Sequence, residues 1–337
     1  MNAPALPGKT PSTPRLLVDV GGTGTRCALQ RRGGPAYGLG VFRNDDHPSL
    51  ARILERYLAD CGERAAVERA ALAVAAPVEA GSGAVSMTNR NWRFSSHDLA
   101  AALGLSEVRI VNDFTANALS IPHLGPADRF EIGDANAEPA GPCAILGPGT
   151  GLGVSGLLPA AEGGWVPIAG EGGHVTLAPA NPQESRLLDV VRDEYGHVSA
   201  ERLLSGGGLA VLYRALTHVL DVARPTPEPH EIAPLAARGD ALAQAALMHF
   251  FSMLGTVAGN LALTLGATGG VYLAGGILPR LREELVVSGF RARFEQKGRY
   301  REYLQRIPTY LITTEYPALL GLASTLDTTP SQEPCKS

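Results

Sequence analysis

Three carboxylates and one histidine stand where they could act on a substrate. Asp113 follows an apolar run typical of a buried strand, and Glu201 begins a helical stretch. Glu171 and His174 lie together in a glycine-rich segment. Carboxylates and imidazole can serve as general bases, as metal ligands or as partners for the vicinal hydroxyls of a sugar. From these residues alone, a glycosidase, a metal site and a sugar phosphotransferase stay open.

Each of these side chains also has an ordinary structural explanation. Asp113 could cap the helix that FTANALS begins, and His174 could be a hydrogen-bonded core histidine. Glu201 could be a first-turn acid favoured by the helix dipole, or a capping-box partner. Other motifs in the sequence are needed to distinguish the structural from the catalytic interpretation of these residues.

Glycine-rich turns favour phosphate chemistry. In the first, an aspartate leaves an apolar strand directly into two glycines and a hydroxyl: Val18, Asp19, Val20, Gly21, Gly22 and Thr23. Glycines allow backbone N–H groups to approach an anion closely, although a plain tight hairpin would have the same composition. In the functional interpretation, Asp19 helps to hold a hydrated Mg²⁺ and Thr23 helps to bind phosphate.

A second glycine cluster runs from Gly147 to Gly153 and includes Gly149, Thr150 and Gly151. A formal GxGxxG runs from Gly151 to Gly156, but a dinucleotide fingerprint requires a helix directly afterwards, and the prolines and glycines that follow leave no room for one. We therefore expect a second phosphate-binding hairpin. The pair Gly275-Gly276 follows a third apolar strand, and its role in binding adenosine depends on the two hairpins that precede it.

Lysine usage narrows the phosphate chemistry further. The chain has three lysines, Lys9, Lys297 and Lys336. None is placed for a P-loop, for the strand lysine of a protein kinase or for a Schiff base. Phosphate must therefore be bound by backbone amides, arginine and metal.

Composition indicates an ordinary globular enzyme. Of 337 residues, 45% are hydrophobic and 18% charged, and the net charge of -4 gives no basic field for nucleic acid. The scattered cysteines Cys27, Cys61, Cys143 and Cys335 lack CxxC spacing, which favours a reducing cytoplasm. Residues 1–14 are proline-rich without an apolar core, which is typical of a disordered tail and not of a signal peptide.

One uncharged stretch, between His249 and Pro279, is long enough to suggest a membrane span. Glycines interrupt it, and we interpret it as a buried helix ending near Gly266, then a strand and a glycine turn. Gly255 and Gly259 have the small-xxx-small spacing of closely packed helices, here inside a soluble core.

The elements that position these residues form two similar α/β halves, each headed by a strand-glycine-strand hairpin. In the first half, a helix within 47–60, a strand before Pro77 and a helix at 96–103 precede the strand that ends at Asp113. In the second half we expect three helices, at about 184–195, 199–204 and 208–221, and then a proline-rich linker at 224–234. A long helix at about 240–265, strands at 270–274 and 309–314, and a last helix at about 317–326 follow.

In this order and spacing the chain resembles the bacterial glucokinase family over about residues 15–325. The segments that carry the resemblance are LVDVGGTGTR, MTNRNWRF, VNDFTANALSIP, GPGTGLGV, GEGGHV, GHVSAERLLSGGGLAVLYR and GGVYLAGGILPR. The resemblance implies an α/β, two-lobed, actin-like ATPase (ribonuclease H-like) fold with a cleft between the lobes. It also implies ATP and Mg²⁺ as cosubstrates and commonly a homodimer. The cysteine-rich zinc motif of the related repressor and sugar-kinase group is absent.

The resemblance assigns roles as well. Asp113 matches the catalytic base, and the glucose-hydroxyl ligands are Asn112, Glu171, His174 and Glu201. Residues 18–23 match the first phosphate loop, 149–151 the second, and Gly275 with Gly276 the adenosine site. Where the family usually reads DVGGTN, this chain has Gly24, which loses a side-chain amide and adds flexibility beside the phosphates.

We expect a cytoplasmic enzyme that phosphorylates glucose at its 6-hydroxyl with ATP, without nucleic-acid or membrane partners. The alternative is a weak or inactive paralogue that binds sugar as a regulator. A DNA-binding repressor is disfavoured because the short segment before the first strand has no room for a helix-turn-helix. The expected organisation is a small α/β domain of 15–122 with about 318–327, a large α/β domain of 123–317, and disordered tails at 1–14 and 328–337.

Overall fold

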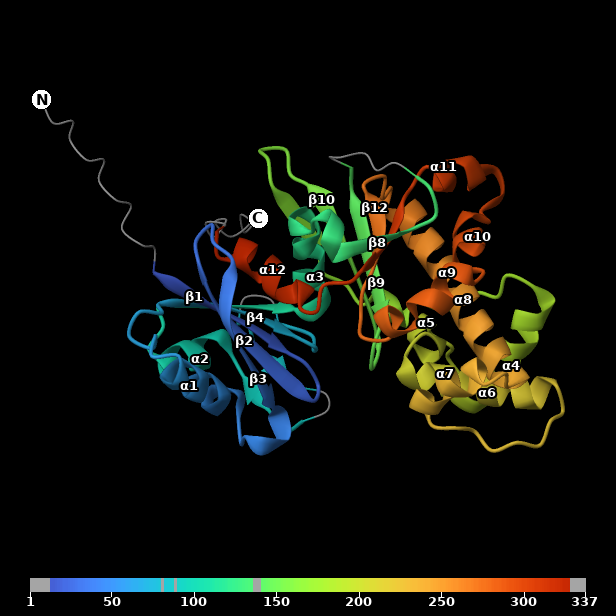
Figure 1. Cartoon of the computed structure of the whole chain (residues 1–337), viewed down its shortest axis with the longest axis horizontal. Coiled ribbons are helices and arrows are strands. Elements are labelled where there is room, and N and C mark those ends of the chain that lie inside the picture. Colours follow the sequence, from blue (N-terminus) through green and yellow to red (C-terminus); the bar gives the residue numbers. More distant parts are fainter. Residues whose placement is uncertain (1–12, 80–81, 88–89, 136–140, 328–337) are drawn as a thin grey trace, which may run out of the picture. The chain divides into compact units, whose positions relative to one another are not determined.

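The computed structural model describes residues 13–79, 82–87, 90–135 and 141–327 (Figure 1). Contacts divide the chain into unit 1, Met1–His123 with Tyr316–Ser337, and unit 2, Leu124–Glu315. Most of the two predicted tails, with Lys9, Cys335 and Lys336, lies outside the described residues. The first strand, β1, begins at Pro14, one residue inside the predicted N-terminal tail.

Unit 1 is built on a five-stranded sheet in the order β3-β2-β1-β4-β7. Its strands are β1 (Pro14–Val20), β2 (Gly24–Arg31), β3 (Ala36–Arg43), β4 (Arg69–Val74) and β7 (Glu107–Asn112). β2 pairs antiparallel with β1, and β3 pairs antiparallel with β2, whereas β1, β4 and β7 run parallel. The strand β3 was not predicted, because it is a largely exposed edge strand whose apolar residues alternate with glycines and not with polar residues.

Helices cover both faces of this sheet (Figure 1). They are α1 (Leu50–Asp60), α2 (Ser96–Leu103), α3 (Asp113–Ser120) and α12 (Pro317–Thr325). Alternate residues of a strand point to opposite faces. Accordingly Leu16 and Val18 pack in the core with α1 and α2, whereas Leu17 packs with α3 and α12. The expected helices at 96–103 and near 317–326 are confirmed.

Unit 2 repeats this topology. Its sheet has the order β11-β10-β9-β12-β13-β8. The strands are β8 (Arg129–Ile132), β9 (Cys143–Pro148), β10 (Leu152–Pro159), β11 (Trp165–Ile168), β12 (Gly270–Leu273) and β13 (Thr309–Ile312). As in unit 1, an antiparallel hairpin with a third strand is followed by two parallel strands. The duplicated architecture inferred from the two glycine hairpins is confirmed.

The helices of unit 2 up to residue 265 agree with the predicted ones except at the linker, whereas no range was predicted for the three helices between 282 and 305. The helices of the unit are α4 (Pro182–Tyr195), α5 (Ala200–Leu203), α6 (Gly206–Val219), α7 (Pro229–Ala237), α8 (Ala241–Leu265), α9 (Arg282–Val287), α10 (Phe290–Glu295) and α11 (Arg301–Gln305). The linker predicted over 224–234 is wrong beyond Glu228, where α7 begins. Pro229 suits the first turn of a helix, and the Glu231 carboxylate accepts a bond from the Glu228 N–H.

Shorter elements complete the chain. The strands β5 (Val85–Ser86) and β6 (Arg93–Phe94) form a separate hairpin in unit 1. The 3-10 helices are η1 (Asn44–Asp46), η2 (Ile121–His123), η3 (Pro126–Asp128), η4 (Gly172–His174), η5 (Leu278–Leu281) and η6 (Gly298–Tyr300). Within the described part of the chain, Cys27, Cys61 and Cys143 are free thiols.

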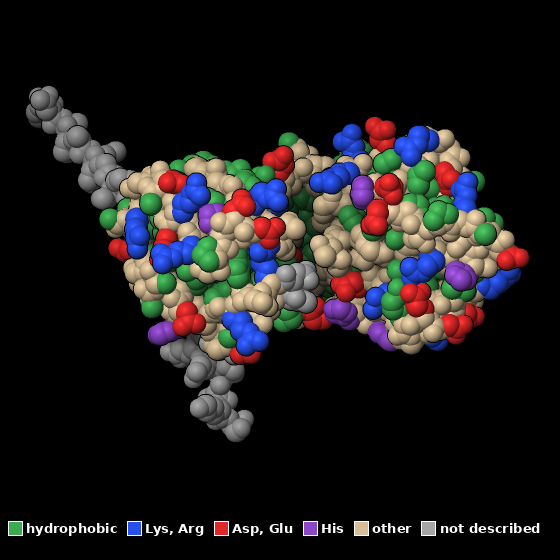
Figure 2. Space-filling model, turned by 90° about the horizontal axis from the view of Figure 1, so that it is seen from below, with side chains coloured by type: hydrophobic (Ala, Val, Ile, Leu, Met, Phe, Trp, Pro, Cys, Tyr) green, Lys and Arg blue, Asp and Glu red, His purple; other side chains and the backbone are tan. Residues whose placement is uncertain are grey.

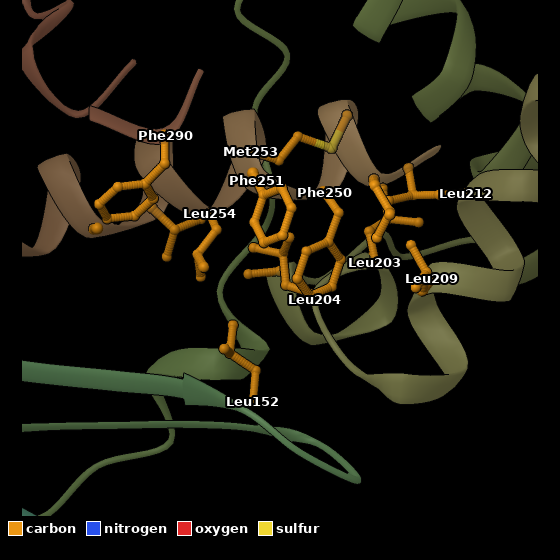
Figure 3. Close-up of a cluster of buried hydrophobic side chains, with 14 of the residues drawn as sticks. Leu152, Leu203, Leu204, Leu209, Leu212, Phe250, Phe251, Met253, Leu254 and Phe290 are labelled. Carbon is orange, nitrogen blue, oxygen red and sulfur yellow. The ribbon is translucent and has the colours of Figure 1, made fainter. Parts of the chain in front are cut away.

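The long helix α8 forms the core of unit 2. Its length and composition would let it cross a membrane, yet most of its apolar window is buried inside the protein, as in the core helix of a soluble protein. Phe250 and Phe251 lie fully inside, against Leu203 and Leu204 of the α5 segment (Figure 3). The same packing therefore anchors the segment that carries Glu201.

Gly255 lets two helices meet. A Cβ at this position would lie 2.2 Å from the Phe290 carbonyl oxygen of α10, and α8 and α10 pack closely along their length. The predicted role of the Gly255/Gly259 spacing in core packing is confirmed.

Gly255→Ala therefore lowers the free energy of unfolding of unit 2 by about 1–3 kcal/mol, because the helices must separate. Gly207→Ala is the matched control: Gly207 also lies in a helix but has open space around it, so this variant is neutral or gains up to about 1 kcal/mol. Urea unfolding measures both. Equal stability of the two variants would contradict the packing assignment.

Candidate active site

In unit 1, the first glycine hairpin and Asp113 both follow the carboxyl ends of parallel strands, on the same side of the sheet. Val20 pairs with Val74 and Val74 with Asn112, so the parallel strands β1, β4 and β7 end in one row. Adjacent strands lie about 4.8 Å apart, which places the start of the hairpin about 10 Å from the residue before Asp113. This spacing leaves room for a substrate group between a phosphate loop and a carboxylate.

Asn112, and not Asp113, caps helix α3. The Asn112 Oδ1 accepts bonds from the N–H groups of Phe114 (2.9 Å) and Thr115 (3.4 Å), so the interpretation of Asp113 as the cap is wrong. Asp113 is the first residue of the helix and is half-buried, and its Oδ1 accepts from the Phe114 N–H at 2.9 Å. The cap fixes the backbone from which the Asp113 carboxylate projects.

Asp19 is a largely buried acid, with its side chain 20% exposed, and it has a cationic neighbour. Burial raises the pKa of its carboxyl, and Arg26, whose Nη1 lies 3.7 Å from Oδ2, opposes this shift. The Arg26 Nη1 also lies 3.4 Å from the Gly24 carbonyl oxygen, so the guanidinium borders the first glycine hairpin. Arg26 was not among the predicted site residues. The lack of suitable lysines and its position opposite Asp19 in the hairpin were usable signals for it.

Two further residues bind the first hairpin. Asn44 and Arg90 donate hydrogen bonds to its backbone carbonyls. Arg90 lies in the quoted segment MTNRNWRF, which was a usable signal, whereas Thr88 and Asn89 of that segment lie outside the described residues. Nothing in the sequence distinguishes Asn44 from an ordinary loop asparagine.

In unit 2, the second glycine hairpin and the Gly275-Gly276 turn are in direct contact. A Cβ on Gly147 would lie 2.3 Å from the Ala274 oxygen, and one on Gly275 would lie 2.4 Å from the Pro148 oxygen. Gly275 also has φ +87°, which favours glycine. The structure thus brings together the turns expected to bind phosphate and adenosine.

The acids of unit 2 gather beside this hairpin. The Glu201 Oε2 accepts a bond from the Leu152 N–H at 2.8 Å, and its Oε1 lies 3.8 Å from the His174 Nδ1. Glu171 precedes η4 and is exposed, and the His174 side chain is 59% exposed, so the core-histidine interpretation is wrong. Glu201 is also a first-turn acid of α5, so the structural and functional interpretations of this residue are compatible.

The chain after the formal GxGxxG continues as strands β10 and β11. A dinucleotide-binding fingerprint requires a helix directly after its glycines, and these glycines are followed by strands. The interpretation as a hairpin is therefore confirmed.

A metal ion here would need coordination from a bound substrate as well as from the protein. Among the described residues there is no group of three or more His, Cys, Asp or Glu side chains that could hold one. Mg²⁺ commonly binds through one or two carboxylates together with water and substrate phosphates. Asp19, beside the first hairpin, fits an ion of that kind.

Charges of both signs are interspersed on the face of the molecule that Figure 2 shows. That face carries no broad field of one sign. A polyanion such as nucleic acid would require one.

Comparisons with other proteins identify a matching family and similar chains. Residues 16–329 match the family model described as Glucokinase. The glucokinase of Nitrobacter hamburgensis is 48% identical over 319 residues, 94% of this chain and 98% of that protein. The chain also spans about half of the "Bifunctional protein glk" of Paraburkholderia xenovorans, with 44% identity over 95% of this chain and 50% of that protein.

Among solved structures, a glucokinase from an Antarctic psychrotroph matches with a TM-score of 0.84 and 34% identity, over 94% of this chain and 99% of that one. The expected two-lobed actin-like ATPase fold is confirmed. The cleft between the lobes stays a prediction.

The raised pKa of Asp19 predicts a pH-dependent effect of Asp19→Asn. An aspartate in the unfolded chain titrates at about pH 4. Above that pH, ionisation of the Asp19 carboxyl lowers the stability of the folded protein, because its pKa is raised by burial, and asparagine avoids this loss. The stability gained by Asp19→Asn over the wild type therefore grows as the pH rises above about 4, as thermal unfolding would measure.

Asp45→Asn serves as the control of opposite sign. A hydrogen bond and the charge of Arg90 lower the pKa of Asp45, so this carboxylate adds stability above about pH 4 that asparagine loses. A pH-independent effect of Asp19→Asn would contradict the burial argument.

Proposed function

The chain belongs to the glucokinase family and catalyses the ATP-dependent phosphorylation of glucose, and from this premise we propose how its own residues perform the reaction. The acceptor is the 6-hydroxyl, and the products are glucose 6-phosphate and ADP. The observation that carries the proposal is the common row of Val20, Val74 and Asn112, which puts the first phosphate hairpin and Asp113 at one sheet edge.

Asp113 is the proposed general base. The 6-hydroxyl attacks the γ-phosphorus in line with the departing ADP oxygen, and the Asp113 carboxylate accepts the hydroxyl proton. Backbone N–H groups of the first hairpin, residues 21–23, stabilise charge on the transferred phosphoryl group. The half-buried setting of Asp113 at the start of α3 holds the carboxylate in place for this task.

The proposed glucose ligands are Asn112, Glu171, His174 and Glu201. The Asn112 Oδ1 is occupied by the α3 N-terminus, so its amide nitrogen, 3.5 Å from the Ala76 oxygen, is the group that remains for sugar. The two carboxylate oxygens of Glu201 have different partners: Oε2 accepts a hydrogen bond from the Leu152 N–H, and Oε1 lies near the His174 ring. We therefore assign Oε1 and the exposed imidazole to the sugar hydroxyls.

The proposed nucleotide contacts are the two hairpins and the third glycine turn. Gly149, Thr150 and Gly151 bind phosphate, and Gly275 with Gly276 borders the adenosine. Asp19 would hold Mg²⁺ through water, and Thr23 would bind phosphate. Bound Mg²⁺ neutralises charge on the phosphate oxygens.

The two units are proposed to be the two domains of the enzyme, with complementary groups. Unit 1 supplies Asp113, Asn112 and the first hairpin, and unit 2 supplies the remaining ligands. The reaction requires both sets on one pair of substrates, and water must be excluded to prevent hydrolysis of ATP. We further propose a cytoplasmic homodimer without nucleic-acid or membrane partners. The regulator without activity has no observation in its favour.

Asp113→Asn keeps the side-chain shape but removes the base, so kcat falls by about 10²–10⁴-fold. The glucose dissociation constant changes little, because the hydroxyl ligands remain. A coupled assay of ADP release and a glucose titration of the variant measure the two effects. Asp60→Asn, an exposed acid of the same unit, is the control and keeps full activity. Near-normal turnover of Asp113→Asn would exclude this residue as the base.

Glu201→Gln lowers kcat/KM for glucose by about 10–100-fold, because bonds to a charged acceptor contribute roughly 1.5–3 kcal/mol. Glu162→Gln changes an exposed glutamate of the same unit and leaves kcat/KM unchanged. Steady-state kinetics with varied glucose measures both. An unchanged value for Glu201→Gln would remove Glu201 from the proposed sugar ligands.

A further inference from the structure

Asn44 is a fully buried polar residue whose side chain is devoted to the first phosphate hairpin. Its Nδ2 donates to the carbonyl oxygens of Gly21 (2.9 Å) and Gly22 (3.4 Å). Its Oδ1 accepts from the buried Thr25 hydroxyl at 2.7 Å, which fixes the orientation of the amide. The backbone N–H of Asn44 also donates to the Thr23 oxygen at 3.0 Å. One residue thus binds three successive carbonyls of the loop.

This arrangement determines where the loop N–H groups point. In a planar trans peptide, the C=O of one residue and the N–H of the next point in opposite directions. Bonds to the carbonyls of Gly21 and Gly22 therefore turn the N–H groups of Gly22 and Thr23 away from Asn44. Among the described residues, no acceptor is recorded for either N–H, and Thr23 is exposed. Adjacent N–H groups with this orientation form an anion site.

Arg90 holds the same loop from another element. Its Nε donates to the Gly22 oxygen at 3.2 Å. The guanidinium is itself held by an ion pair with Asp45 and lies 5.1 Å from the ring centroid of Trp92. No residue of the MTNRNWRF segment takes part in the proposed mechanism. The contact of Arg90 with Gly22 indicates that the segment supports the first hairpin.

We propose that Asn44, assisted by Arg90, is a positioning residue that orients the N–H groups of Gly22 and Thr23 toward the phosphates of ATP. The proposal rests on the proposed function of this loop. Gly24 next to these residues has no side chain to restrict the backbone, so the restraint comes from outside the loop. A buried amide with both ends bonded supplies it, because any other loop conformation would leave polar groups buried without partners.

A purely structural asparagine would affect stability alone, so the test separates nucleotide binding from folding. Asn44→Ala removes all the side-chain bonds, and Asn44→Asp replaces the donating amide with a carboxylate that faces two carbonyls. For both variants we expect the KM for ATP and the dissociation constant for a non-hydrolysable ATP analogue to rise by about tenfold or more, as the loss of one or two hydrogen bonds implies. The KM for glucose stays within about twofold, since no proposed sugar ligand is touched.

Thr309→Val is the matched control. Thr309 is fully buried and donates to the Ile132 oxygen at 2.6 Å in unit 2, so its loss lowers the thermal midpoint without raising the KM for ATP. Arg90→Leu covers the case in which the Asn44 variants do not fold. It removes one bond to the loop and keeps apolar contact with Trp92, and it should raise the KM for ATP by about three- to tenfold.

Two results would overturn the proposal. The first is an Asn44 variant that is less stable but has an unchanged KM for ATP and unchanged binding of the ATP analogue. The second is an unchanged KM for ATP in Arg90→Leu when the Asn44 variants do not fold. Failure of the function itself is distinguishable, because the wild type would then form no ADP with glucose. Titration calorimetry with a non-hydrolysable ATP analogue would still decide on the loop: weakened binding in the variants supports the proposal, and retained binding overturns it.

Discussion

Parallel pairing of β1, β4 and β7 is the constraint on which the chemistry of unit 1 depends. It ends three strands in one row, so the hairpin after Val20 and the acid after Asn112 face the same space. A slip of one residue would exchange the two faces of a strand. Apolar cores on both faces, with Leu16 and Val18 on one and Leu17 on the other, hold the register. The positions of the proposed base and phosphate loop are thus set by burial far from the substrates.

Unit 2 uses the same topology for a different purpose. Its hairpin packs against the third glycine turn, and Glu201 binds the hairpin backbone at Leu152. A proposed sugar ligand is therefore bonded to a proposed phosphate loop within one rigid core. The few lysines of the chain fit this design, because backbone amides held by neighbouring side chains take the place of a mobile ammonium group.

Much of this fold could be predicted from the sequence, because strong periodicity and glycine turns are local signals. The helix at 96–103, the buried α8 and both hairpins follow from them. The strands β3 and β11 could not be predicted, since both are partly exposed edge strands and β11 contains Pro167. The proposed site residues came from the order of several motifs. Their partner Asn44 did not, because a contact between separate segments leaves no pattern in either one. Arg26 lies opposite Asp19 in the predicted hairpin and could have been found.

The central claim is that this chain transfers phosphate from ATP to glucose. The most direct test measures ADP release by the wild-type protein with Mg-ATP across a panel of hexoses, and identifies the product. The account predicts ADP formation that depends on glucose and equals the glucose 6-phosphate formed. Binding of glucose without ADP formation, or ADP release at the same rate without sugar, would contradict it.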